Sequence, residues 1–181
     1  MNIDDVENIF NEDCFPTEQI KLLESNNSGK IIQQVQINDG GVDYYKILRI
    51  DPNQKDPFPY FKSGDPYHLK RIVDYILLVW YNDKIYTVLT ELKTGSGTAI
   101  QQLDNSKVFW QFVLNVAESK GVSMSNIDMT IKVKLYHSQK ENTKLKIPEY
   151  NMETDCIIYP WKTLRLRDVI IMAQENINKI G

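Results

Sequence analysis

Two acids and a lysine in the middle of the chain have the types and spacing to hold a metal ion beside a phosphate. Asp74 lies in one apolar run, and Glu91 and Lys93 lie in the next. Asn82 and Asp83 separate the runs, and a two-residue turn there makes the numbers of paired residues add up to 165. Asp74 then faces Glu91. Opposed residues have Cβ atoms about 5 Å apart, and residues two apart share a face, so we predict one patch of three charges.

The residues around this patch predict two central strands covered on both faces. Apolar side chains occupy alternating and non-alternating positions alike in both runs: Ile72, Val73, Ile76, Leu77, Leu78, Val79, Val88, Leu89 and Leu92. Such continuous apolar runs are typical of strands buried on both sides. Charges are costly in that setting unless something binds them. The pattern therefore favours a ligand site over an exposed edge pair.

Paired carboxylates are hard oxygen ligands, which favours Mg²⁺ or Mn²⁺ over Zn²⁺. We expect Asp74 and Glu91 to bind the ion, with the backbone carbonyl of Leu92 as a third protein oxygen. A divalent ion held in this way can act as a Lewis acid and activate water for phosphodiester hydrolysis. Lys93 could orient that water or donate to the phosphate as charge develops.

At Asp74 and Glu91-Leu92-Lys93, the chain resembles the PD-(D/E)XK nuclease superfamily. The flanking sequences Arg71-Ile-Val-Asp74-Tyr-Ile-Leu and Gln102-Leu103 are close to its RecB-like variant. The resemblance implies an α/β fold with a restriction-endonuclease-like core, in which helices flank a central mixed β-sheet. It spans roughly residues 16–137, with motif-level similarity over about 71–103.

The same resemblance implies the roles of individual residues. Asp74 and Glu91 would bind metal, Lys93 would assist the nucleophile, and Gln102 would line the site from the following helix. These four are the expected catalytic residues. The tyrosine that often follows the glutamine-leucine pair is absent, since Asp104-Asn-Ser comes next.

Composition is ordinary for a globular protein. The 181 residues suit one domain over 1–181, with 42% hydrophobic and 25% charged residues. No apolar run approaches the roughly 20 residues of a membrane helix, and the start of the chain lacks the basic and apolar stretches of a signal peptide. We therefore expect a cytoplasmic protein with no membrane contact. Cys14 and Cys156 are expected to be free thiols.

Charge is unevenly distributed along the chain. Residues 1–29 carry seven acids and one base, so a formal charge of −6 precedes a body of +3, for a total of −3. We expect nucleic acid, most simply DNA, to be bound modestly or with help from metal. The acidic N-terminal segment could contact a protein partner. Basic residues that could contact phosphates, or simply lie on solvated faces, are Lys62, Lys70, Arg71, Lys132, Lys134, Lys162, Arg165 and Arg167.

The remaining patterns predict the elements around the site. Turn residues at 38–41 predict a second hairpin, and Pro and Gly density at 51–66 predicts a loop. Apolar and basic residues alternate at 129–137, which predicts a half-exposed strand with a basic face. The predicted helices are 4–11, 16–25, 99–120 and 166–180, and the other strands are 30–37, 44–50 and 155–159, with a polar loop at 141–150.

These observations favour a metal-dependent nuclease acting on DNA, in restriction, repair or defence. One alternative is a nuclease-fold protein that binds nucleic acid or a protein partner without cutting. The modest basic charge of the body supports that alternative. The presence of Asp74, Glu91 and Lys93 together, the triad, supports the enzyme. A third alternative is an interaction protein in which the triad is a structural ion-pair network.

Overall fold

The elements form two runs of strands that are separated by one long helix, with short helices before the first run and a helix after the second. The computed structural model describes residues 3–25, 31–50, 71–93, 99–136, 147–160 and 162–177. The predicted loop at 51–66 lies outside the described residues. In chain order the elements are α1 (Ile3–Ile9), the 3-10 helix η1 (Glu12–Cys14), β1 (Lys21–Ser25), β2 (Ile31–Asn38), β3 (Tyr44–Arg49), β4 (Tyr75–Tyr81), β5 (Lys84–Lys93), α2 (Ala99–Ser119), β6 (Ile127–Tyr136), β7 (Glu149–Asn151), β8 (Cys156–Tyr159), β9 (Thr163–Arg165) and α3 (Leu166–Ile177).

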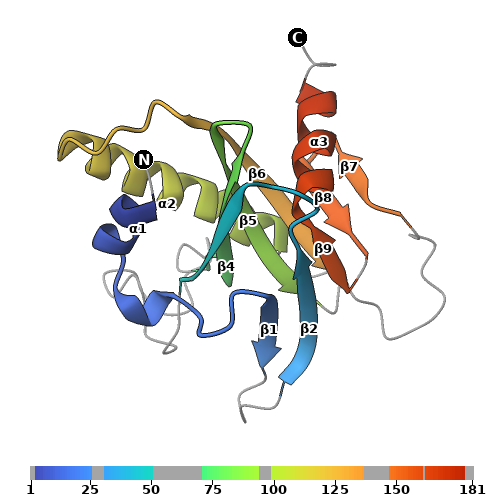
Figure 1. The fold of residues 1–181 in the computed structure, drawn as a ribbon. Helices are drawn as coiled ribbons and strands as arrows, with labels where there is room; N and C mark the ends of the chain where they lie inside the picture. The colour runs from blue at the N-terminus through green and yellow to red at the C-terminus, as the bar shows by residue number, and fades with distance from the viewer. Residues whose placement is uncertain are drawn as a thin grey trace.

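A six-stranded mixed sheet forms the centre of the molecule, in the order β3-β4-β5-β6-β8-β7 (Figure 1). The strands β3, β4 and β5 are antiparallel neighbours. The strand β6 then runs parallel to β5 after the crossover through α2, and β8 runs parallel to β6. The predicted α/β class with a mixed sheet is confirmed.

The β4–β5 hairpin has the predicted turn. Asn82 and Asp83 have φ angles of 51° and 62°, as a type I′ turn requires at both central residues. Asn and Asp tolerate this left-handed backbone better than most residues do. Pairing runs from Tyr81 opposite Lys84 to Tyr75 opposite Thr90, so the predicted register is confirmed.

Both faces of β4 are covered, as its continuous apolar sequence predicted. Leu77 packs in a cluster with Val169 and Ile170 of α3, whereas Leu78 packs in a cluster with Leu103 and other residues of α2. Both leucines are fully buried. Figure 1 shows the two helices on different sides of the sheet.

The predicted helix over 16–25 is wrong. Lys21–Ser25 is the strand β1, which pairs antiparallel with β2 from Lys21 opposite Gln36 onward. The hydroxyl of Tyr75 accepts the N–H of Leu23 and donates to its carbonyl, at 3.0 and 2.8 Å. Backbone pairing and this contact outweigh the local helical pattern, so the acidic N-terminal segment is only partly helical.

The predicted hairpin across residues 38–41 is also wrong, although a turn is present. Gly40 and Gly41 have φ angles of 67° and 90°, which suit glycine. The turn carries the chain from one sheet to another, because β2 belongs to a three-stranded sheet ordered β1-β2-β9. Its neighbour β9 is parallel and far along the sequence.

The strand β6 is not half-exposed, because residues on both of its faces are buried, Ile131 and Val133 on one face and Lys132 on the other. Its basic side faces α2, and Lys132 is only 6% exposed. The predicted loop over 141–150 contains the short strand β7, while residues 141–146 lie outside the described part. The long helix and the closing helix were predicted correctly, as α2 and as α3 through Ile177.

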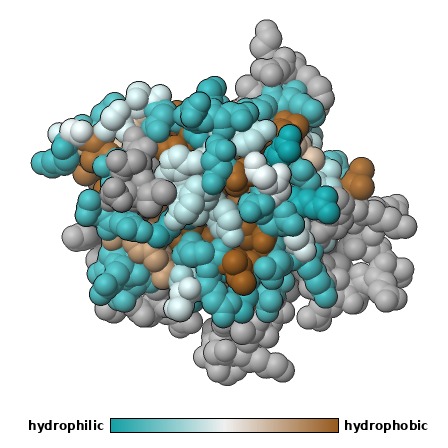
Figure 2. Space-filling view, viewed as in Figure 1, coloured by the Kyte–Doolittle hydropathy of each residue, from teal (hydrophilic) through white to brown (hydrophobic). Residues whose placement is uncertain are grey.

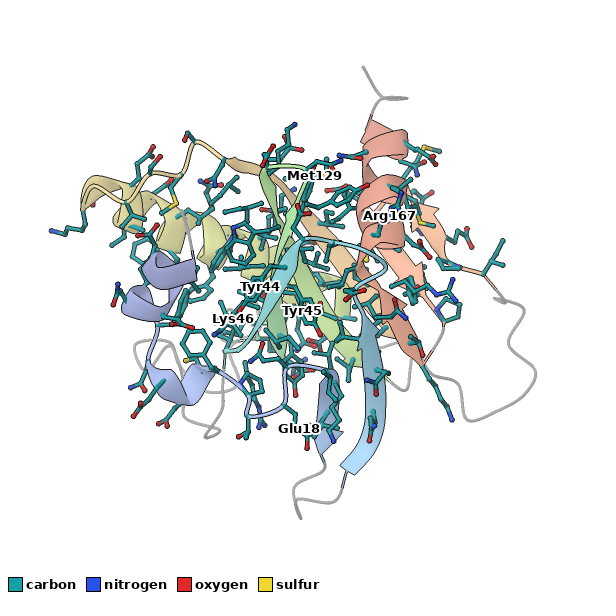
Figure 3. The ribbon with its side chains drawn as sticks, viewed as in Figure 1. Glu18, Tyr44, Tyr45, Lys46, Met129 and Arg167 are labelled. Atoms are coloured by element: carbon teal, nitrogen blue, oxygen red, sulfur yellow. The ribbon has the colours of Figure 1, made fainter. Side chains whose placement is uncertain are left out.

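The segment that runs from α1 through η1 to Phe15 packs onto the body through several contacts. Phe10 stacks on Trp110 of α2 with ring centroids 6.0 Å apart. Lys46 of β3, labelled in Figure 3, pairs with Glu7 and lies over the ring of Phe15. Figure 2 shows a largely hydrophilic face interrupted by small apolar patches. In the part of the chain described, we find no helix long and apolar enough to cross a membrane.

Candidate active site

The two predicted acids lie across the open end of the β4–β5 hairpin. The last pair in the ladder is Tyr75 with Thr90, so the next step along each strand reaches Asp74 and Glu91. The backbone N–H of Asp74 donates to Oε2 of Glu91 at 3.3 Å. The structure therefore brings the two residues together as the register predicted.

The acids share the side of the sheet that faces α2. Ile76 of β4 and Leu89 of β5 pack beneath α2, and alternate residues of a strand share a face. Asp74 is two residues before Ile76, and Glu91 is two residues after Leu89. Both acids therefore lie on the α2 face.

Glu91 is fully buried within the sheet, whereas Asp74 is partly exposed. The Oε1 atom of Glu91 is also shielded from solvent. Removing a carboxylate from water is costly unless other groups or an ion compensate its charge. A cation held between a buried and a partly exposed carboxylate would reduce this cost, and the open side of Asp74 would give that cation access.

The two residues after Glu91 end the strand. Leu92 pairs with Leu135 of β6, and its side chain is buried in the cluster on the opposite face. Lys93 pairs with Tyr136 of β6, but its side chain lies outside the described residues, as do residues 94–98. The roles predicted for the Leu92 carbonyl and the Lys93 ammonium remain predictions.

Side chains in the first turns of α2 hold the two residues that precede Asp74. The Nε2 atom of Gln102 donates to the carbonyl of Ile72 at 3.2 Å. The Oγ atom of Ser106 accepts the N–H of Val73 at 2.7 Å and donates to the carbonyl of Gln102 at 2.7 Å. Gln102 thus contacts the chain two residues before Asp74. Its role in lining the site stays a prediction.

Ser106 was missed by sequence reasoning, although a signal was present. It is fully buried on the face of α2 that also carries Leu103 and Trp110. A small polar residue in the middle of an apolar helix face must satisfy its hydroxyl internally. Here the hydroxyl of Ser106 links α2 to Val73, the residue just before Asp74. Ser106 therefore supports the position of Asp74.

The strand β6 adds a basic residue to the same row. Glu91 and Lys134 are Cα partners in the parallel pair β5–β6, and neighbouring strands lie about 4.8 Å apart. Val133 and Leu135 face the other cluster, so Lys134 lies on the α2 face with Glu91. It is partly exposed. Asp74, Glu91 and Lys134 therefore form a row across three neighbouring chain segments.

The two lysines of β6 differ in their surroundings. The Nζ atom of Lys132 donates to Asp104 at 2.8 Å and to the carbonyl of Thr154 at 2.6 Å. These contacts fix Lys132 as a structural link between α2 and the turn before β8. Arg167 lies over the ring of Tyr81 near the hairpin turn, and Lys62 and Lys70 lie outside the described residues.

Within the described ranges, no group of three or more His, Cys, Asp or Glu side chains lies close enough together to hold a metal ion. The candidate site has two carboxylates, which is a common number of protein ligands for Mg²⁺. A comparison of the chain with protein-family models, curated proteins and solved structures found no match.

Proposed function

We propose that this chain is a metal-dependent nuclease of the PD-(D/E)XK type that hydrolyses phosphodiester bonds in DNA. The observation that carries the proposal is the buried carboxylate of Glu91, which reaches the backbone of Asp74 across the hairpin. The antiparallel strands β3, β4 and β5, followed by α2 and the parallel strand β6, agree with the proposed restriction-endonuclease-like core.

The donor set fits Mg²⁺ or Mn²⁺. Hard carboxylate oxygens from Asp74 and Glu91 suit either ion, and the few protein ligands leave room for water and a phosphate. Bound there, the ion would supply Lewis acidity and an activated water. Asp74 and Glu91 would position the ion, and Gln102 and Ser106 would hold the chain at Asp74 through the contacts described above.

Two lysines would act on the phosphate. Lys93 follows Glu91 by two residues, and we assign it the role of orienting the attacking water or donating to the developing charge. Lys134 extends the row beyond Glu91, and we assign it a contact to a phosphate oxygen of the substrate. Such a contact would position the DNA backbone without reading its sequence.

Conservative substitutions of the two acids test this proposal. Purified Asp74→Asn and Glu91→Gln variants are assayed on linear, circular and single-stranded DNA with Mg²⁺ and with Mn²⁺. Each should lose most cleavage, because members of one catalytic unit are not additive. Asp83→Asn is the matched control, since Asp83 lies in the turn at the other end of the same hairpin. It should cleave like the wild type.

Binding without metal separates the enzyme from a binding protein. Removing either carboxylate lowers negative charge where a polyanion docks, so DNA affinity should hold or rise in both acid variants. Lys93→Ala should weaken binding. A wild-type protein that cuts no substrate with either ion, yet binds DNA or a protein partner independently of Asp74, Glu91 and Lys93, would contradict the nuclease proposal.

A further inference from the structure

A short segment in the first turns of α2 holds the chain that enters the site. Three of its side chains bond to the backbone of residues 71–73, at 3.2, 3.0 and 2.7 Å: Gln102, Asn105 and Ser106. These backbone groups directly precede Asp74. We call residues 102–106 the anchor segment. Its orientation therefore helps to set the position of Asp74.

Asp104 joins the anchor segment to β6. Its Oδ1 atom accepts from Nζ of Lys132 at 2.8 Å, and Lys132 also donates to the carbonyl of Thr154 at 2.6 Å. Thr154 is itself held, because its N–H donates to Oδ1 of Asn151 at 3.1 Å. The anchor segment is thus joined both to the chain before Asp74 and to β6 with the turn before β8.

The burial of Lys132 separates this link from an ordinary surface ion pair. Its side chain is 6% exposed, whereas that of Asp104 is 55% exposed. Burying an ammonium is costly, and an apolar residue could often replace it without loss of stability. A hydrogen bond has a preferred geometry, however, whereas apolar packing such as that of Leu103 has no direction. Trp110 adds a directional contact to Thr87 at 2.9 Å, but it lies six residues beyond Asp104.

We propose that Lys132 is a positioning residue for Asp74 and that it acts through Asp104 and the anchor segment. The N–H of Asp74 donates to Glu91 at 3.3 Å, so a shift of residues 71–73 would change the spacing of the two acids. Contacts that orient metal ligands typically matter about 10- to 100-fold for metal affinity. The effect on metal rests on the proposed nuclease function, whereas the effect on the backbone of Asp74 does not.

Two substitutions of Asp104 form a matched pair. Asp104→Asn and Asp104→Ala remove the same negative charge, but only Asn keeps an oxygen that can accept from Lys132. The exposure of this side chain means that Ala leaves no buried cavity. Lys107→Met is a further control, because it breaks an exposed ion pair between α2 and Asp155. Such pairs contribute little to stability.

Native-state hydrogen exchange, followed by NMR without metal, measures the backbone directly. The N–H groups of Val73 and Asp74 are both hydrogen-bonded, to Ser106 and Glu91. In Asp104→Ala their exchange rates should rise by about tenfold, which corresponds to the net contribution of one hydrogen bond. The rate at Leu77, in the middle of β4, should change much less. Asp104→Asn and Lys107→Met should exchange like the wild type.

Metal binding and cleavage give a second readout. In calorimetric titration, Asp104→Ala should bind Mn²⁺ about tenfold or more weakly than the wild type. Its kcat should fall while KM for DNA holds, because Lys134 is unchanged. Lys132→Met should match Asp104→Ala. The double variant should be no weaker than either single variant, since both substitutions break the same contact.

Four results would overturn the positioning role. They are unchanged exchange at Val73 and Asp74 in Asp104→Ala, an equally large rise at Leu77, equal effects of the two Asp104 substitutions, and Mn²⁺ binding in Asp104→Ala as tight as in a wild type that binds the ion. A wild type that binds no Mn²⁺ and cuts no DNA would instead contradict the nuclease proposal. The exchange rates would then still decide whether Lys132 positions Asp74.

Discussion

The backbone N–H of Asp74 donates to Oε2 of Glu91 at 3.3 Å, across the end of the β4–β5 hairpin. The contact uses the main chain of Asp74 and leaves its side-chain carboxylate outside this hydrogen bond. Asp74→Asn therefore keeps the donor that orients Glu91 while removing a charge. This makes it a cleaner probe of metal binding than a truncation would be.

Metal should stabilise the folded protein through this pair. An ion that binds only the native state adds about 2.7 kcal/mol when its free concentration is 100 times its Kd. For a domain of this size, that corresponds to a rise of roughly 5–10 °C in Tm. Thermal unfolding with Mg²⁺ or Mn²⁺ should show the rise in wild type and in Asp83→Asn. It should be absent in Asp74→Asn. No shift in wild type at millimolar ion would count against a metal site.

Lys134 should bind a phosphate of the substrate. Lys134→Gln is expected to weaken DNA binding and to raise KM more than it lowers kcat. Each phosphate contact contributes about 0.9 to the slope of log affinity against log salt, so the slope should fall by about that amount. Lys120→Gln is the control, because it removes the same charge beyond the far end of α2. Equal effects of the two substitutions would show that only net charge matters.

The sequence carried enough information to predict the hairpin and the pairing of its acids. Asn82 and Asp83 favour the positive φ angles of a two-residue turn, and a turn of known length fixes the register of both strands. Because the turn joins the two strands directly, this inference needs only the local sequence. Asp74 and Glu91 could therefore be placed together without knowing the rest of the fold.

Long-range pairing could not be predicted in the same way. The strand β2 has the parallel neighbour β9 far along the chain, and nothing near Gly40 indicates that neighbour. The crossover through α2 also leaves the register of β6 against β5 open, so Lys134 could not be assigned to Glu91. The strand β6 was predicted as half-exposed because a lysine usually indicates solvent. Lys132 is instead buried against Asp104.

Ser106 should support both stability and activity. Ser106→Ala removes the acceptor of the Val73 N–H, a bond of 2.7 Å at a buried position. A buried donor left without an acceptor costs about 1–3 kcal/mol. The unfolding free energy, measured with urea, should fall by that amount. Cleavage should also fall because the chain leading into Asp74 loses an anchor.

Ser119→Ala is the matched control for this prediction. Ser119 lies on the same helix, and its Oγ atom also donates to a backbone carbonyl, that of Val116. It is exposed, so water can replace the lost contact. A stability loss in Ser119→Ala as large as that in Ser106→Ala would contradict the role assigned to the buried hydroxyl.

Cys156 should make the protein less stable at high pH. Burial raises the pKa of this thiol from 9.0 to about 11. The folded state therefore retains the proton in a range where the unfolded chain loses it, and the unfolding free energy falls as pH rises from 9 to 11. A shift of this size corresponds to a loss of about 2.7 kcal/mol at most.

Urea unfolding at several pH values should show that the unfolding free energy falls more steeply with pH in wild type than in Cys156→Ala. Cys156→Ala is expected to be less stable at neutral pH because it leaves a cavity, so the comparison rests on the slopes. Identical slopes would show that the thiol titrates alike in both states.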